Sequence, residues 1–288
     1  MPIQFFGQPD LHPIGVKYPL RILFLTSVRD VVGDDQNGQF IQTPGRLDYM
    51  MGVPEFTIRH TRMTGELFQL VEVVGIVTDD TAKDCAKHNI AALPEMQGRW
   101  LVPAFSDLGV PTINIPSNFR LLSLSDIEGR RKAKRDFEGQ VLDVMGRLGA
   151  DVLVSDHYMA KLEFVFPPHL QFGRALNIHP APTVEGHEFC FRGKTPTADA
   201  IALAARSNPL VFTGATLHVM DPEIDHGPAL AFATDTRVFA SDDPMALRYR
   251  NYQASKLPVF VHGLKHYVLN IFPHLDGLDL TRLVQMEI

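Results

Sequence analysis

The sequence predicts an α/β fold in which a Rossmann-like, doubly wound and mostly parallel sheet carries helices on both faces. Three observations predict it. In the central part of the chain, short apolar runs of strand length alternate with segments of helical period, which is the pattern of βαβ units. The 288 residues are 45% apolar and 21% charged, the balance of a globular protein with a core. Polar motifs follow apolar strands, at the edge where open α/β sheets bind ligands.

Apolar runs bounded by turn residues predict the strands of this sheet. They cover, in chain order, residues 21–26, 71–77, 151–155, 175–178, 211–219 and 229–238. The connection between the last two is polar and rich in turn residues. We therefore expect the sheet to include strands from both halves of the chain.

Two helices have clear end signals. Apolar residues recur at i, i+3, i+4 spacing from Arg130 to Leu148, and Gly149 stands where a C-cap belongs. Thr195 and Pro196 open an Ala-rich helix over 197–205.

Two further helical segments are expected. One covers 159–166, between two of the predicted strands. A last helical region begins at Pro244, and Pro258 should kink or divide it before it ends near Phe272.

We expect a single domain over 1–288 with two insertions. Residues 30–64 contain several Gly and Pro without sustained periodicity, which predicts a long loop carrying a short helix. Such loops are uncommon in compact domains, so this one is either the substrate side of a site or a surface insertion. Residues 181–190 form the second insertion.

Charge and composition exclude several classes of protein. A net charge of −6 without a long Lys/Arg cluster argues against nucleic acid as a partner. No apolar stretch is long enough to cross a membrane, and no signal-peptide core is present. Cys85 and Cys190 cannot form a disulfide framework, so we expect packing thiols in a reducing cytoplasm. The expectation is an enzyme that acts on a small molecule.

Two polar motifs could carry chemistry. Asn177-Ile178-His179-Pro180 ends an apolar strand, and Asp225-His226-Gly227-Pro228 lies at another strand junction. Alone, His179 would more often be a structural hydrogen-bonding group, and Asp225 a turn residue. Together, Asn177, His179 and Asp225 supply an amide donor, an imidazole and a carboxylate. These groups can stabilise an oxyanion, move a proton and fix the charge on the imidazole.

Ordered motifs of this chain resemble a known family. They are 177–180, 191–193, 198–201, 213–219 and 224–228. Over roughly residues 130–272 they look like the folate-dependent formyltransferases, which include glycinamide ribonucleotide transformylase. The resemblance implies an N-formyltransferase that uses N10-formyltetrahydrofolate and needs no metal. Its catalytic residues would be Asn177, His179 and Asp225, with His218 in a supporting role.

The resemblance also implies a mechanism and a folate pocket. An uncharged amine attacks the formyl carbon, Asn177 and protonated His179 stabilise the oxyanion, and Asp225 holds the imidazolium and helps relay the amine proton. The implied folate-binding residues are Met159, Lys161, Leu162, Met220, Asp221, Glu223 and Ile224. Ordinary core packing is an equally good interpretation of Met159 and Leu162.

Two departures from the family pattern concern the acceptor. Glycinamide ribonucleotide transformylase has a glycine-rich phosphate-binding turn after its first strand, whereas 27–35 here contains adjacent aspartates. The insertion at 181–190 adds further acidic residues. These features are similar to the hydroxyornithine transformylases of siderophore pathways, whose acceptor has no phosphate, so N5-hydroxyornithine is the expected acceptor. The acceptor-binding residues would be Arg29, Glu185, Glu188 and Arg192.

Alternative functions remain open at this stage. Phosphoribosylglycinamide formyltransferase and formyltetrahydrofolate hydrolase share the chemistry, although the hydrolase carries a regulatory domain ahead of its first strand. A methionyl-tRNA formyltransferase would need a further domain after the catalytic one. Outside the class, the complete trio disfavours a non-catalytic binding module, and the missing ligand spacing disfavours a metal-dependent hydrolase. We expect a small-molecule amine as partner, with no nucleic acid, membrane or obligate protein partner.

Overall fold

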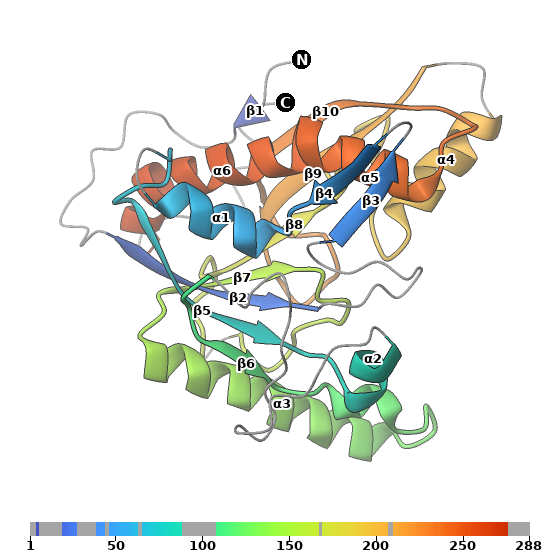
Figure 1. Cartoon of the computed structure of the whole chain (residues 1–288). Helices are drawn as coiled ribbons and strands as arrows, with labels where there is room; N and C mark the ends of the chain where they lie inside the picture. Colours follow the sequence, from blue (N-terminus) through green and yellow to red (C-terminus); the bar gives the residue numbers. More distant parts are fainter. Residues whose placement is uncertain are drawn as a thin grey trace.

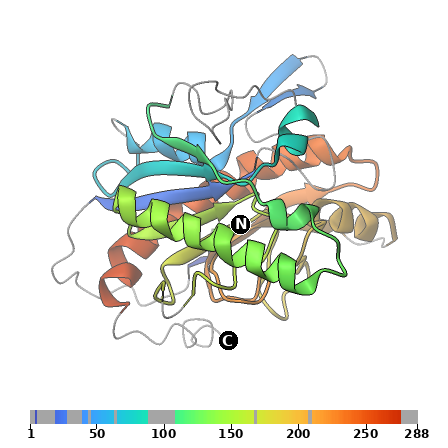
Figure 2. The same ribbon diagram turned by 90° about the horizontal axis from the view of Figure 1, so that it is seen from below.

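The computed structural model describes residues 4–5, 19–27, 39–43, 46–62, 65–87, 108–166, 169–206 and 210–275. Within these ranges an eight-stranded sheet has the order β1-β10-β9-β8-β7-β2-β5-β6. Figure 1 shows helices α1 (Val53–Thr61) and α6 (Leu257–His266) on one side of the sheet and α3 (Ile127–Leu148) on the other. Figure 2, the view from below, shows α3 lying across the face of the sheet that it covers.

The sheet is mostly parallel, as predicted. Its parallel strands are β6 (Thr112–Asn114), β5 (Val71–Thr78), β2 (Leu20–Thr26), β7 (Val152–Asp156) and β8 (Ala175–His179). Its antiparallel edge consists of β9 (Val211–Val219), β10 (Ala229–Val238) and β1 (Gln4–Phe5). The predicted strands agree with the observed ones to within one or two residues, whereas β1 and β6 were not predicted because both are very short.

Strand β2 shows why these strands are continuous apolar runs. Ile22 and Phe24 pack into the core cluster that includes α1 and α6, and Leu23 and Leu25 pack into the cluster that includes α3. All four side chains are fully buried. Because both faces of a doubly wound sheet are covered, an alternating polar face is absent from the central strands.

The two helices with clear end signals are confirmed. Helix α3 begins after Asp126, whose carboxylate accepts a hydrogen bond from the Gly129 amide. It ends at Gly149, which has a left-handed φ of 60° as the predicted C-cap requires. Helix α4 covers Pro196–Arg206, and the short helices α2 and η1 cover Ala82–Lys87 and Asn118–Leu121.

The C-terminal helical region is divided near Pro258, as predicted. Helix α5 (Pro244–Asn251) passes into a π-helical turn, η2 (Tyr252–Lys256), before α6 begins. Proline has no backbone N–H, so the α-helical hydrogen bond at this point cannot form and the chain adopts a wider turn. The region ends in η3 (Tyr267–Ile271) and η4 (Phe272–His274).

The expected helix over 159–166 is wrong. This segment is an irregular loop, because the buried carboxylate of Glu138 on α3 accepts hydrogen bonds from the amides of Glu163, Phe164 and Val165. These amides therefore do not need helical carbonyl partners.

The expected long loop at 30–64 is also wrong for the residues that are described. They form an antiparallel hairpin of β3 (Gln39–Thr43) and β4 (Arg46–Met50), followed by α1, the short helix that was expected. Its two five-residue strands lack a regular alternation of polar and apolar residues and are bordered by Gly and Pro, so no strand pattern was visible. Residues 181–190 do form a loop. One domain over 1–288 stays a prediction.

Candidate active site

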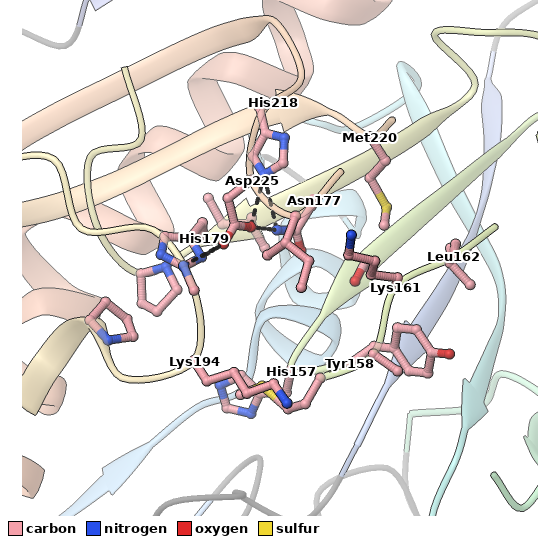
Figure 3. Close-up of a pocket in the computed structure, with 18 of the residues that line it drawn as sticks. His157, Tyr158, Lys161, Leu162, Asn177, His179, Lys194, His218, Met220 and Asp225 are labelled. Carbon is pink, nitrogen blue, oxygen red and sulfur yellow. Dashed lines mark hydrogen bonds and ion pairs between the residues drawn. The ribbon is translucent and has the colours of Figure 1, made fainter. Parts of the chain in front are cut away.

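A pocket lies where the loops after β7, β8 and β9 meet. It is lined by residues from 155–162, 177–180, 193–196 and 218–225, and by Arg248 and Tyr252 from the C-terminal helices. Figure 3 shows the side chains that surround it. The pocket therefore lies at the carboxyl ends of β7 and β8, the edge at which open α/β sheets bind ligands.

The carboxylate of Asp225 is the centre of the predicted catalytic group. Its Oδ1 lies 3.3 Å from Asn177 Nδ2 and 3.6 Å from His218 Nε2, and its Oδ2 lies 3.4 Å from His179 Nδ1. The amide of Gly193 donates to the same Oδ2 at 2.9 Å. The structure thus brings together all four residues that the sequence singled out, from three separate segments (Figure 3).

Asp225 is held in its ionised form although it is only 7% exposed. Burial by itself raises the pKa of this carboxyl group, but the hydrogen bonds and charges of His179 and His218 outweigh it and hold the pKa well below its usual range. Its φ of 56° lies in the left-handed region, which few residues other than glycine, asparagine and aspartate adopt. The backbone is thus strained at the residue that organises the site.

The two histidines differ in the partners of their ring nitrogens. His218 Nδ1 lies 2.9 Å from the Val219 carbonyl, and its Nε2 lies 3.0 Å from Asn177 Nδ2 and 3.6 Å from Asp225 Oδ1. His179 Nε2 faces the Phe191 carbonyl at 2.8 Å, and its Nδ1 faces Asp225. Both ring nitrogens of His179 therefore face an oxygen atom, which fixes the orientation of the ring beside Asp225.

Gly227 explains how Asp225 reaches this position. A Cβ atom on Gly227 would lie 1.7 Å from the carbonyl oxygen of Val219, so only glycine allows the turn to lie against the end of β9. The Val219 amide donates to the Pro228 carbonyl at 2.9 Å and fixes the same approach. The turn after β9 is therefore locked with Asp225 facing the pocket.

All of the residues implied for folate binding line the pocket. Leu162 is 1% exposed and belongs to the core cluster under α3, so its side chain serves packing as well as the pocket wall. The folate-binding candidates come from two segments. Met159, Lys161 and Leu162 lie on the loop after β7, and Met220, Asp221, Glu223 and Ile224 lie on the segment after β9.

Three of the four residues expected to bind the acceptor, Glu185, Glu188 and Arg192, are described and are not in the pocket lining. Glu185 and Glu188 are exposed on the 181–190 loop. Arg192 donates from Nε and Nη2 to the Thr183 carbonyl, at 3.0 and 2.8 Å, and so closes that loop on itself. Arg29 lies outside the described residues.

Sequence reasoning missed several pocket residues. They are Ser155, His157, Tyr158, Lys194, Arg248 and Tyr252. A signal was present for one of them: Asp156-His157 directly follows an apolar strand, as Asn177-x-His179 does. Among the described residues no cluster of three or more His, Cys, Asp or Glu could hold a metal ion. No described helix is long and apolar enough to cross a bilayer.

Known proteins resemble this chain at the level of structure. No protein-family model and no curated protein matches the sequence. PvdF of pyoverdin biosynthesis, an N10-formyltetrahydrofolate-dependent formyltransferase, matches with a TM-score of 0.72 and 27% identity, over 87% of this chain and 99% of that one.

Two more distant structures share the fold. Glycinamide ribonucleotide transformylase 1 from Symbiobacterium toebii has a TM-score of 0.53 and 16% identity, over 87% of this chain and 88% of that one. A formyltetrahydrofolate deformylase from Burkholderia mallei has a TM-score of 0.51 and 18% identity, over 87% and 65%. The chain thus has the fold of the folate-dependent formyltransferases, which confirms the family resemblance found in its motifs.

Proposed function

We propose that the protein transfers the formyl group of N10-formyltetrahydrofolate to the nitrogen of a small amine or hydroxylamine. The observation that carries the proposal is the convergence of Asn177, His179 and Asp225 at one pocket. The similarity to PvdF over nearly its whole length supports the same chemistry. Each member of the group has a role that formyl transfer requires.

The reaction needs a stabilised oxyanion and a path for one proton. The acceptor nitrogen attacks the formyl carbon, and the carbonyl electron pair moves to the oxygen. The Asn177 amide and the positive charge of His179 stabilise that oxygen, and one such group typically contributes about a hundredfold or more in rate. When the bond to N10 breaks, its electron pair goes to N10. The proton lost by the acceptor nitrogen passes through Asp225 to N10, so the reaction is balanced.

His179 acts here mainly through its charge. Both of its ring nitrogens already face oxygen atoms, those of Phe191 and Asp225. We therefore assign to His179 the role of a protonated ring whose charge, balanced by Asp225, stabilises the oxyanion.

The folate is proposed to lie between the loops that follow β7 and β9. Met159, Leu162, Met220 and Ile224 give this part of the lining an apolar character that suits a flat heterocycle. N10-formyltetrahydrofolate is a co-substrate that arrives and leaves with each turnover.

For the acceptor we propose N5-hydroxyornithine. Its hydroxylamine nitrogen is largely unprotonated at neutral pH, and it carries no phosphate, which fits the aspartates at 34 and 35. The support from structure is PvdF, a formyltransferase of pyoverdin biosynthesis. A cytoplasmic location belongs to the same proposal, because Cys85 and Cys190 are free thiols.

Absorbance of released tetrahydrofolate tests the proposal, with a panel of amines and with water alone. We expect release to depend on the amine, and kcat/KM to be higher for N5-hydroxyornithine than for glycinamide ribonucleotide. A higher value for glycinamide ribonucleotide would falsify the acceptor assignment alone. Equal release in water would identify a deformylase instead.

A further inference from the structure

A second polar cluster opens into the same pocket. Lys256 and Asp156 are both 0% exposed, and Lys256 Nζ lies 2.7 Å from Asp156 Oδ1. Lys256 Nζ also donates to the Tyr252 hydroxyl at 2.9 Å, and that hydroxyl is hydrogen-bonded to His157 Nε2. His157 and Tyr252 both line the pocket. A buried ion pair is thus connected to the pocket through two hydrogen bonds.

Three features distinguish the cluster from ordinary core packing. A fully buried ion pair must lose its hydration, and well-packed apolar residues are often at least as stable. His157 has a φ of 60°, in the left-handed region that few residues other than glycine adopt. Tyr252 and Lys256 bound a π-helical turn, a feature frequent at functional sites. Their coincidence at one pocket indicates that the cluster is kept for function.

A chain of hydrogen bonds connects the buried ion pair to the pocket. Burial alone raises the pKa of Asp156, but the charge of Lys256 outweighs it and holds the pKa below its usual range, so the pair is ionised. A lysine ammonium has donors only, so the Tyr252 oxygen accepts. The same hydroxyl is hydrogen-bonded to His157 Nε2, which fixes the orientation of the ring at the pocket. His157 is thereby positioned as the hydrogen-bond donor that the cluster presents to the pocket.

Cationic side chains accompany this donor. Lys194 and Arg248 also line the pocket. In Figure 3 His157 and Lys194 lie at the lower edge of the pocket, whereas Asp225 and its partners lie at the upper edge. The pocket therefore has a carboxylate at one edge and hydrogen-bond donors with positive charge at the other.

We propose that the Asp156–Lys256–Tyr252–His157 cluster, together with Lys194 and Arg248, binds the carboxylate of the formyl acceptor. The acceptor class is then an amino acid whose side-chain nitrogen is formylated, with the nitrogen at Asp225 and the carboxylate at His157. His157 contacts the substrate, whereas Tyr252, Lys256 and Asp156 are positioning residues that act through it. That the bound amino acid is the formyl acceptor rests on the proposed function. The carboxylate-binding site itself can be tested by binding measurements without turnover.

Calorimetric titration of L-ornithine and of 1,4-diaminobutane, which lacks the carboxylate, tests this site in the absence of folate. Wild type is expected to bind L-ornithine at least about tenfold more tightly, the usual effect of a charge-assisted hydrogen bond. Tyr252→Phe keeps the ring and removes the donor, and His157→Gly suits the left-handed backbone. Both should reduce the preference by about tenfold. Tyr249→Phe, three positions before Tyr252 and outside the pocket lining, should keep it.

Equal binding of the two compounds by wild type, or no binding of either, would overturn the proposal. So would a preference that survives in both variants. If the variants weaken binding of N10-formyltetrahydrofolate and leave the ornithine preference intact, the carboxylate belongs to the glutamate tail of the folate, and the acceptor assignment is wrong. Failure of the proposed function would appear differently, as no formyl transfer to any amine while the ornithine preference remains.

Discussion

The two polar clusters of the pocket differ in how accessible their central carboxylates are. Around Asp225, one carboxylate is shared among His179, His218 and Asn177 at the surface of the pocket. Around Asp156, the charge is completely buried and is connected to the pocket through Tyr252 and His157. A charge that acts on reacting atoms must be accessible to them. A charge that only orients a donor can be buried, where the low dielectric strengthens its effect.

The largest expected effect concerns the buried pair. Lys256→Met leaves Asp156 buried and unpaired, which should lower the free energy of unfolding by about 3–5 kcal/mol. Adding Asp156→Leu replaces the pair by apolar side chains and should recover most of that loss. Urea unfolding of the two variants measures the difference. If the single variant were as stable as the double, Asp156 would not be the buried charge described here.

Asp225→Asn should have the next largest effect, this time on the rate. Asparagine tolerates the left-handed backbone of position 225, so the turn is kept while the charge that holds His179 is lost. We expect kcat for formyl transfer to fall by about a hundredfold or more, with KM for the folate little changed. Steady-state release of tetrahydrofolate measures both constants. Near-normal turnover would remove Asp225 from the mechanism.

Gly227→Ala tests how the first cluster is positioned. The added Cβ must move the Val219 carbonyl, which is also the partner of His218 Nδ1. We expect a loss of about 1–3 kcal/mol in stability, typical of overpacking, together with a fall in kcat. Gly139→Ala on α3 is the matched control. Its Cβ meets nothing within 4 Å, so helix propensity should stabilise it by about 0.5–1 kcal/mol. Thermal unfolding distinguishes the loss of stability expected for Gly227→Ala from the gain expected for Gly139→Ala.

The smallest effect is the pH dependence of stability. The pKa of Asp225 is depressed in the folded protein, so as the pH falls the unfolded chain takes up this proton first. Its contribution is therefore complete above about pH 5 and is lost below about pH 4, as the pH falls toward the folded pKa. Asp225→Asn should flatten the dependence of stability on pH between about pH 5 and pH 2. Urea midpoints measured at intervals across this range test it, and parallel curves for the two proteins would contradict it.

The first cluster could be predicted from the sequence because its residues lie in contiguous motifs at strand ends. Asn177-x-His179 and Asp225-His226-Gly227 each follow the rule that ligands bind beyond the carboxyl ends of strands. The strands themselves were predictable, since burial on both faces makes them continuous apolar runs. The same short motifs therefore indicate both the chemistry of the first cluster and its position at the ends of the strands.

The second cluster could not be predicted in the same way. Asp156 and Lys256 are separated by 100 positions, and only the return of the C-terminal helices over the sheet brings them together. Lys256 stands directly before an apolar helix segment, and no charged residue near it in the sequence marks it as part of a pair. The helix expected at 159–166 failed for a similar reason, because the Glu138 carboxylate that satisfies its amides comes from α3. Long-range polar contacts of this kind leave no local pattern.

The Asp225 cluster is proposed to act on the chemical step and the Asp156 cluster on binding of the acceptor. This central claim is tested most directly by the rate of formyl transfer at low and at saturating concentrations of the acceptor. Wild type, Asp225→Asn and Tyr252→Phe are compared with N5-hydroxyornithine and a fixed excess of N10-formyltetrahydrofolate. We predict that Asp225→Asn is slow at both concentrations, because it loses stabilisation of the transition state. Tyr252→Phe should be slow only at low acceptor and recover at saturation. Equal losses at both concentrations in the two variants would contradict the account, because both clusters would then act on the same step.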